Sequence, residues 1–123
     1  MPGPSFVVEV AGGVPVVKTP QEIDVTNSSS LQSALLDAAY NGYERLVVDM
    51  TGTRYCDASA SHVLAAAHRR ALGEGREMLL AVSDALVLRV FALTGIDRMI
   101  PCFASLDEAL WHAADSRAAS PGS

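Results

Sequence analysis

Residues 46–50, which read Leu-Val-Val-Asp-Met, form a nearly continuous apolar run. A short run of this kind is typical of a β-strand covered on both faces, because a strand with one face in water alternates apolar and polar residues. A second such run occupies residues 78–82. Both runs predict buried strands of one sheet, and we place residues 46–50 in its central strand.

The start of the chain has the pattern of a β-hairpin. Two runs rich in β-branched residues, 6–10 and 14–18, are separated by Ala-Gly-Gly. This spacer has the length and chemistry of a hairpin connection, so the two runs are expected to pair as antiparallel strands. Residues 100–103 can form a short last strand, which Pro101 places at an edge of the sheet because proline has no N–H to donate.

Four segments are expected to be helices, at about residues 31–40, 59–72, 85–94 and 106–115. Ser, Thr, Asn or Asp stands ahead of each segment, as is common at helix starts. Apolar residues recur within the segments at helical spacing, which indicates one buried side per helix. The residues expected on the buried side of the second helix are Val63, Leu64, Ala67, Ala71 and Leu72, and those of the third are Leu86, Val87, Val90 and Phe91.

These elements follow one another in the order β-β-α-β-α-β-α-β-α, without an internal repeat. The order predicts a single α/β domain, in which a mixed β-sheet has helices packed on it. With 123 residues, of which 50% are hydrophobic, the chain can bury one core. We expect residues 5–115 to form the domain, residues 1–4 to be flexible, and residues 116–123 to be a disordered tail.

The charge pattern narrows the function. The formal net charge is −5, and the basic residues are scattered except for Arg69 and Arg70, so no positive stripe can follow a phosphate backbone. We expect no direct contact with nucleic acid. The N-terminus lacks the apolar segment of a secretory signal, and no apolar run reaches the ~20 residues that cross a bilayer. These features predict a cytoplasmic protein without membrane insertion.

Cysteine and glycine positions argue against bound groups. Cys56 and Cys102 lie far apart without CxxC or Cys/His spacing, which disfavours a zinc site and predicts buried free thiols. Gly73 and Gly75 follow a helix and precede a strand, the reverse of a nucleotide-binding loop, so they mark a helix end. We expect no metal and no cofactor.

The segment 55–62 lies between a buried strand and an amphipathic helix, where α/β sheets commonly present their binding sites. Asp57 and Ser59 are residues that favour helix starts, so an N-cap is the simplest structural role for each. The small neighbours Ala58 and Ala60 leave the hydroxyl of Ser59 uncrowded at the helix N-terminus. We therefore single out Ser59 as a hydroxyl that a kinase can reach.

Three regions resemble the STAS domain of anti-sigma-factor antagonists. Residues 46–51 read Leu-Val-Val-Asp-Met-Thr, where the family has a strand like Val-Val-Leu-Asp-Leu-Ser, and residues 57–60 read Asp-Ala-Ser-Ala, where it has Asp-Ser-Ser-Gly. Residues 87–98 are similar to Val-x-Arg-Val-x-x-Leu-Thr-Gly-Leu-Asp-Arg, and residues 101–110 to Pro-x-x-x-Ser-Leu-Glu-Glu-Ala-Leu. The resemblance extends over about residues 5–115 and implies a single STAS-like domain.

The resemblance also implies a mechanism. Unphosphorylated antagonists of this family bind an anti-sigma factor that is itself an ATP-dependent serine kinase, and so release a sigma factor. Phosphorylation of the third residue of the tetrapeptide, here Ser59, inactivates the antagonist, and a phosphatase is a further implied partner. The ATP belongs to the kinase. The implied partner-binding residues are Asp57, Ala58, Ser59 and Ala60.

The tetrapeptide departs from the family pattern at two positions. Ala58 replaces a serine and Ala60 a glycine, so a neighbouring hydroxyl is lost and a methyl group is added beside Ser59. Ser61 is an offset candidate for modification, outside the family register. His62 stands where the family usually has a small residue, and it is expected to be a partly exposed helix residue without a role.

Two other functions fit parts of the sequence. A serine hydrolase would need Asp57, Ser59 and His62 to converge, but side chains on one helical turn fan outward, and the Gly-x-Ser-x-Gly pattern is absent. We therefore expect no catalytic residue and no enzymatic activity. The alternative that keeps the fold is a STAS module that binds a ligand or acts as a scaffold, in a sensory assembly or as an accessory subunit of lipid transport, without a phosphorylation switch.

Overall fold

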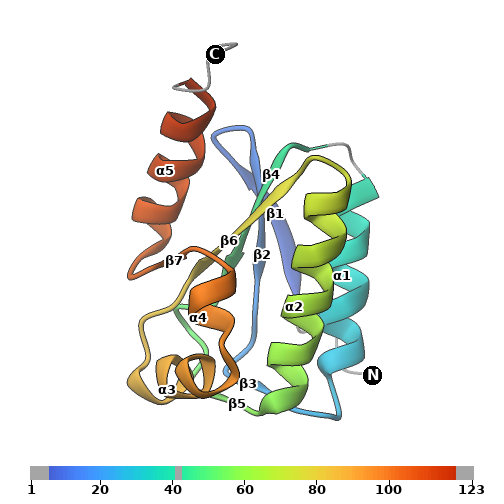
Figure 1. Ribbon diagram of the computed structural model, residues 1–123, viewed down its shortest axis with the longest axis vertical. Helices are drawn as coiled ribbons and strands as arrows, with labels where there is room; N and C mark the ends of the chain where they lie inside the picture. Colours follow the sequence, from blue (N-terminus) through green and yellow to red (C-terminus); the bar gives the residue numbers. More distant parts are fainter. Residues whose placement is uncertain (1–5, 41–42, 119–123) are drawn as a thin grey trace.

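The computed structural model describes residues 6–40 and 43–118 (Figure 1). The main sheet has five strands in the order β1-β2-β4-β6-β7, so β4 is the central strand and β7 lies at an edge, as predicted. β1 and β2 pair antiparallel and the other pairs of this sheet are parallel, which makes the sheet mixed. The strands are β1 (Val7–Ala11), β2 (Val14–Lys18), β4 (Arg45–Asp49), β6 (Glu77–Ala81) and β7 (Cys102–Phe103).

The predicted hairpin is confirmed, and two glycines form its turn. Ala11 pairs with Val14, which leaves Gly12 and Gly13 as the two turn residues. Their φ angles are 58° and 82°, in the left-handed region. A two-residue turn with positive φ at both positions matches the twist of the flanking strands, and glycine adopts it without steric strain.

Helices cover both faces of the main sheet (Figure 1). α1 (Ser28–Tyr40) and α2 (Ala58–Gly73) lie on one face, and α5 (Leu106–Ala118) lies on the other. α3 (Ala85–Thr94) lies at the lower end of the sheet in Figure 1, and the short α4 (Ile96–Met99) follows it. The predicted class, α/β with helices packed on a mixed sheet, is confirmed.

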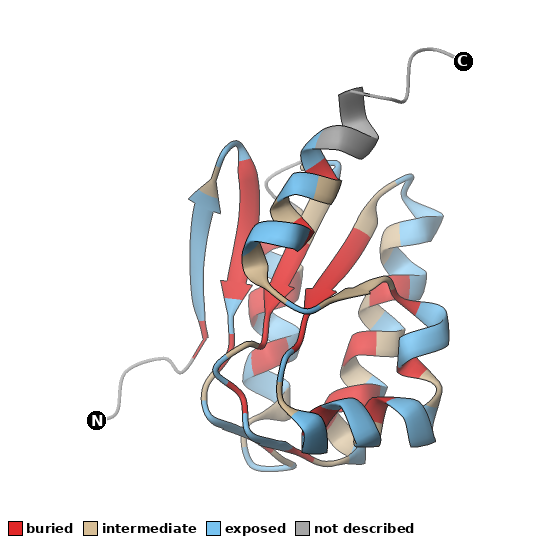
Figure 2. Cartoon of the chain, turned by 90° about the vertical axis from the view of Figure 1, so that its left-hand side faces the viewer, coloured by how far each residue is buried: buried red, intermediate tan, exposed pale blue. Residues whose placement is uncertain are grey.

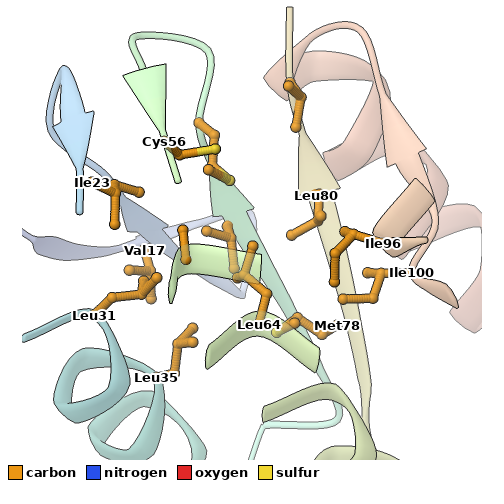
Figure 3. Packing of buried hydrophobic residues seen from close by; sticks show 14 of the residues in the cluster. Val17, Ile23, Leu31, Leu35, Cys56, Leu64, Met78, Leu80, Ile96 and Ile100 are labelled. Atoms are coloured by element: carbon orange, nitrogen blue, oxygen red, sulfur yellow. The ribbon is translucent and has the colours of Figure 1, made fainter. Parts of the chain in front are cut away.

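The central strand is apolar because both of its faces are covered. Val47 belongs to the hydrophobic cluster under α5, with Ala109, whereas Val48 belongs to the larger cluster under α1 and α2, with Leu64. Both valines are fully buried, and the inner strands are buried along most of their length (Figure 2). Figure 3 shows how the larger cluster fills the space between the sheet and its helices.

Three short elements were not predicted. β3 (Glu22–Ile23) and β5 (Tyr55–Cys56) form a separate parallel pair, and β5 falls within a segment expected to be a loop. α4 inserts one further turn of helix before β7. Elements of two to four residues are too short to produce a hydrophobic period, so the sequence pattern does not reveal them.

The buried sides of two helices differ from the prediction. In α2 the buried residues are Ala60, Ser61, Leu64 and His68, whereas Leu72 is 56% exposed. In α3 Val87 and Phe91 are buried, whereas Leu86 is 64% exposed. α3 packs at the end of the sheet, so only a narrow stripe with four-residue spacing reaches the core.

The end of the chain also differs from the prediction. α5 continues to Ala118, whereas the domain was expected to end at residue 115. Residues 1–4, expected to be flexible, and residues 119–123 of the expected tail lie outside the described residues.

Candidate functional site

Asp57 and Ser59 meet at the start of α2. Asp57 is the N-cap residue, with an extended backbone, and its Oδ1 accepts a hydrogen bond of 2.9 Å from the backbone N–H of Ser59. The hydroxyl of Ser59 donates to the same oxygen. An aspartate at this position satisfies an amide that has no partner within the helix. The helix start predicted here is confirmed, and the Ser59 hydroxyl has a defined orientation on a partly exposed residue.

The neighbours of Ser59 point in different directions. Ala58 is exposed, whereas Ala60 is fully buried in the larger hydrophobic cluster. The methyl group that replaces the family's glycine therefore enters the core and does not cover the Ser59 hydroxyl. His62 is exposed, and no hydrogen bond within the described part of the chain connects it to Ser59.

Ser61, the offset candidate, is buried. It is 4% exposed, and its Oγ is hydrogen-bonded to the Oγ1 of Thr94 at 3.0 Å. Thr94 is the last residue of α3, so this bond joins the first turn of α2 to the end of α3. A kinase cannot reach Ser61 without opening this contact, which leaves Ser59 as the accessible hydroxyl of the pair.

A second carboxylate, that of Asp24, which the sequence analysis missed, lies close to this helix start. The N–H of Asp57 donates to the carbonyl of Ile23 at 3.2 Å, so the residue after Ile23, Asp24, is near Asp57. Hydrogen bonds from Thr26, first from its hydroxyl and then from its N–H, lower the pKa of Asp24. The Asp-x-Thr-Asn pattern at residues 24–27 is the local signal of this turn.

Asp84 adds negative charge to the same end of the sheet. It is the N-cap of α3, and its carboxylate accepts from the N–H groups of Leu86 and Val87 at 2.8 and 3.2 Å. Burial, together with the smaller effect of the negative charges of Asp57 and Asp84, raises the pKa of the Cys56 thiol to about 11. The charges of two carboxylates, Asp57 and Asp84, therefore both act on Cys56, so this end of the sheet carries more than one negative group.

Buried hydroxyls hold the loop that leads from β4 toward this site. The hydroxyls of Thr19 and Thr53 are 2.6 Å apart, and the hydroxyl of Thr53 donates to the carbonyl of Pro20 at 2.6 Å. Both threonines are buried. Buried polar groups that are mutually satisfied stiffen a structure, so the connection between β4 and β5 has a defined path.

Apolar side chains are exposed on α3, which contacts both α2 and β5. Leu86 is 64% exposed and Leu93, next to Thr94, is 78% exposed. Tyr55, two residues before Asp57, is 50% exposed. Exposed apolar residues that gather beside a polar site are typical of protein–protein contact surfaces.

The described residues were also compared with the patterns of metal clusters and membrane-crossing helices. No group of three or more potential metal-binding side chains forms among them. None of the described helices combines the length and apolar character that a membrane crossing requires. Both cysteines are free thiols, Cys56 buried and Cys102 partly buried.

A family model identifies the domain. The STAS domain model matches residues 5–109. The chain therefore belongs to the STAS domain family, as the sequence motifs indicated. A search of curated protein sequences found no significant match.

Solved structures agree with this assignment. An anti-sigma factor antagonist from Mycobacterium paratuberculosis is 28% identical, with a TM-score of 0.79 over 85% of this chain and 89% of that one. SpoIIAA of Bacillus, an anti-sigma factor antagonist solved in unphosphorylated and phosphorylated forms, is 16% identical in the unphosphorylated form, with a TM-score of 0.75 over 89% of this chain and 96% of that one. A sulfate transporter family protein from Wolinella succinogenes is 17% identical, with a TM-score of 0.74 over 86% and 88% of the two chains.

Proposed function

We propose that this STAS protein is an anti-sigma factor antagonist that is switched by phosphorylation of Ser59. In the unphosphorylated form it binds an anti-sigma factor with serine kinase activity in the cytoplasm, and a sigma factor is released. The kinase then uses its own ATP to phosphorylate Ser59, which ends the binding, and a phosphatase restores the active form. The chain itself supplies no catalytic group and contacts no nucleic acid.

The observation that supports this proposal most strongly is the hydroxyl of Ser59 bonded to the carboxylate of Asp57 at a partly exposed helix start. The carboxylate orients the hydroxyl for attack on a phosphate that the kinase presents. Ser61, by contrast, is buried against Thr94. The similarity to the M. paratuberculosis antagonist, at 28% identity over most of both chains, is consistent with this role.

Phosphorylation would change the charge of the surface more than its shape. A phosphate adds roughly −1.5 to −2 charge and three strong acceptor oxygens. It also removes the hydrogen that Ser59 donates to Asp57 and places two negative groups in contact. The positive end of the α2 helix dipole stabilises this charge within the domain, so the fold need not change.

The phosphate is expected to weaken the binding of the partner. A partner that covers Asp57, Ala58 and Ser59 must remove water from them, and an uncompensated charge resists that removal. Leu86 and Leu93 on the adjacent α3 offer the apolar area that such a docking surface requires. The same surface therefore binds well without the phosphate and poorly with it.

A second candidate function, a ligand-binding STAS module, has one observation in its favour. A cleft between α1 and α2 is lined mainly by apolar residues, among them Leu35, Leu36, Val63 and Ala67. Its volume is about 100 Å³, whereas sites for drug-sized ligands span roughly 300–1,000 Å³. The cleft suits only a very small ligand, which favours the antagonist.

Capture of the partner tests the proposal. Immobilised Ser59→Ala protein, incubated with a lysate of the source cell, should retain an ATP-dependent serine kinase, because the complex cannot be ended by phosphorylation. The captured kinase and ATP should then modify the parent protein, and mass spectrometry should locate the phosphate on Ser59. Phosphate on Ser61 alone would contradict the assignment of the switch, and retention of no kinase would contradict the proposed function.

A further inference from the structure

A groove on the α5 side of the sheet contains the only tryptophan of the chain. The groove has a volume of about 420 Å³. Trp111 lies on α5, which covers the face of the sheet opposite to α1 and α2 (Figure 1). The groove is therefore separate from the start of α2 and from Ser59. Its lining residues are Phe103, Asp107, Glu108, Trp111 and His112.

Three aromatic rings line this groove, and the largest of them is mostly exposed to solvent. The rings of Phe103 and His112 are in tilted contact, with centroids 4.9 Å apart, and both residues are partly buried. Trp111, the largest side chain of the group, is 68% exposed. Tryptophan is enriched at the centres of protein interfaces, where its large ring gains most from being covered. Its exposure here indicates a surface that a partner can cover.

Two carboxylates lie in the same groove. Asp107 and Glu108 are in the first turn of α5, one helical turn before Trp111. The Oε1 of Glu108 accepts from the N–H of Ala104 at 3.2 Å, and the N–H of Glu108 donates to the Oγ of Ser105 at 3.1 Å. Glu108 is therefore held in place. Acidic residues in a first turn also complement the helix dipole, but that role does not account for the exposed ring beside them.

We propose that this groove binds an arginine side chain of a basic protein partner. The face of a tryptophan ring attracts a cation, and carboxylates bind the planar guanidinium through paired hydrogen bonds. Among the lining residues that the structure describes there is no lysine or arginine, so the groove presents negative charge and aromatic faces together. A small-molecule site encloses most of its ligand, whereas Trp111 is mostly exposed, so a side chain delivered by a larger surface fits this groove better than a free small cation.

A single tryptophan makes the test direct. A fluorescein-labelled tetra-arginine peptide is titrated into the intact protein, with a tetra-citrulline peptide of similar shape and no charge as the comparison. The indole N–H resonance of Trp111 should shift and saturate with the arginine peptide, and it should not shift with the citrulline peptide. A Trp111 resonance that stays in place while the arginine peptide binds would overturn the proposal.

Variants distinguish binding of the peptide in the groove from the general electrostatic attraction between an acidic protein and a basic peptide. Glu108→Gln removes the charge but keeps an oxygen for the Ala104 N–H, and Trp111→Ala removes an exposed ring, so both should fold. Each should weaken binding, measured by peptide anisotropy, about two- to fivefold. The matched control is Glu9→Gln, which removes the same charge from exposed β1 at the other edge of the sheet. Equal weakening by the control would mean that only net charge attracts the peptide and would overturn the proposal.

Discussion

The hydroxyl oxygens of Ser61 and Thr94 are hydrogen-bonded to each other at 3.0 Å across the contact between α2 and α3. Ser59 is two residues earlier on the same helix. Two residues correspond to a rotation of about 200° around a helix of 3.6 residues per turn. The two serines therefore lie on nearly opposite sides of α2, and only Ser59, bonded to Asp57, remains accessible.

Substitutions of Ser59 should separate binding from its regulation. Ser59→Ala should fold, resist phosphorylation and still bind the partner kinase, because only a hydroxyl is lost. Ser59→Asp should bind about five- to 150-fold more weakly, the usual range for a coupling of this kind, since it adds a permanent charge beside Asp57. Calorimetric titration measures both affinities. Ser33→Asp, at an exposed position of α1, is the control, and a loss of equal size there would point to net charge alone.

The N-cap at Asp57 should contribute measurably to stability. Asp57→Ala removes the acceptor of the Ser59 N–H and should lower the free energy of unfolding by about 1 kcal/mol. Asp57→Asn retains an oxygen in the same place and should lower it much less. Urea unfolding measures both values. If alanine and asparagine are equivalent, the cap does not stabilise the helix.

His68 should make the protein sensitive to acid. It is 6% exposed and its Nδ1 has no hydrogen-bond partner. Burial lowers its pKa below the usual 6.5; the charge of Glu77 acts in the opposite direction, and that of Arg69 in the same one. The unfolded chain therefore takes up a proton at higher pH than the folded one, and the free energy of unfolding should fall as the pH drops below about 6.5.

Replacement of each histidine on α2 tests this dependence. His68→Leu should remove most of the decrease in stability below pH 6.5, whereas His62→Leu, at an exposed position of the same helix, should keep it. Urea unfolding across this pH range gives the comparison. If both variants lose stability in acid as the parent does, His68 is not the group responsible.

The two thiols should react slowly in the folded protein. Burial raises the pKa of both Cys56 and Cys102 to about 11, so each is almost entirely protonated at pH 8. A disulfide reagent should label them slowly in native protein and rapidly in guanidinium chloride. Because the unfolded thiols ionise near pH 9, stability should also fall between about pH 9 and 11. A Cys56–Cys102 disulfide recovered after mild oxidation would contradict this assignment.

Short-range patterns in the sequence were sufficient to predict the main strands, the hairpin and the helix starts. The apolar run at residues 46–50 predicted the central strand, and Gly12 and Gly13 predicted the hairpin turn. Asp57 caps an amide only two residues away, so this part of the site was also predictable. Such features depend on residues close together in the chain, whose preferences act before any tertiary contact forms.

Tertiary structure alone decided which sides of the helices are buried and which groups share a surface. Leu72 and Leu86 are exposed while Ser61 and His68 are buried, although apolar character favours the opposite. The partner of Ser61 is 33 residues away, and Asp24 reaches Asp57 only through the pairing of β3 with β5. The sequence of one helix defines its periodicity, but the neighbours that pack against it determine how far each side is covered. Burial therefore depends on distant segments that local patterns do not contain.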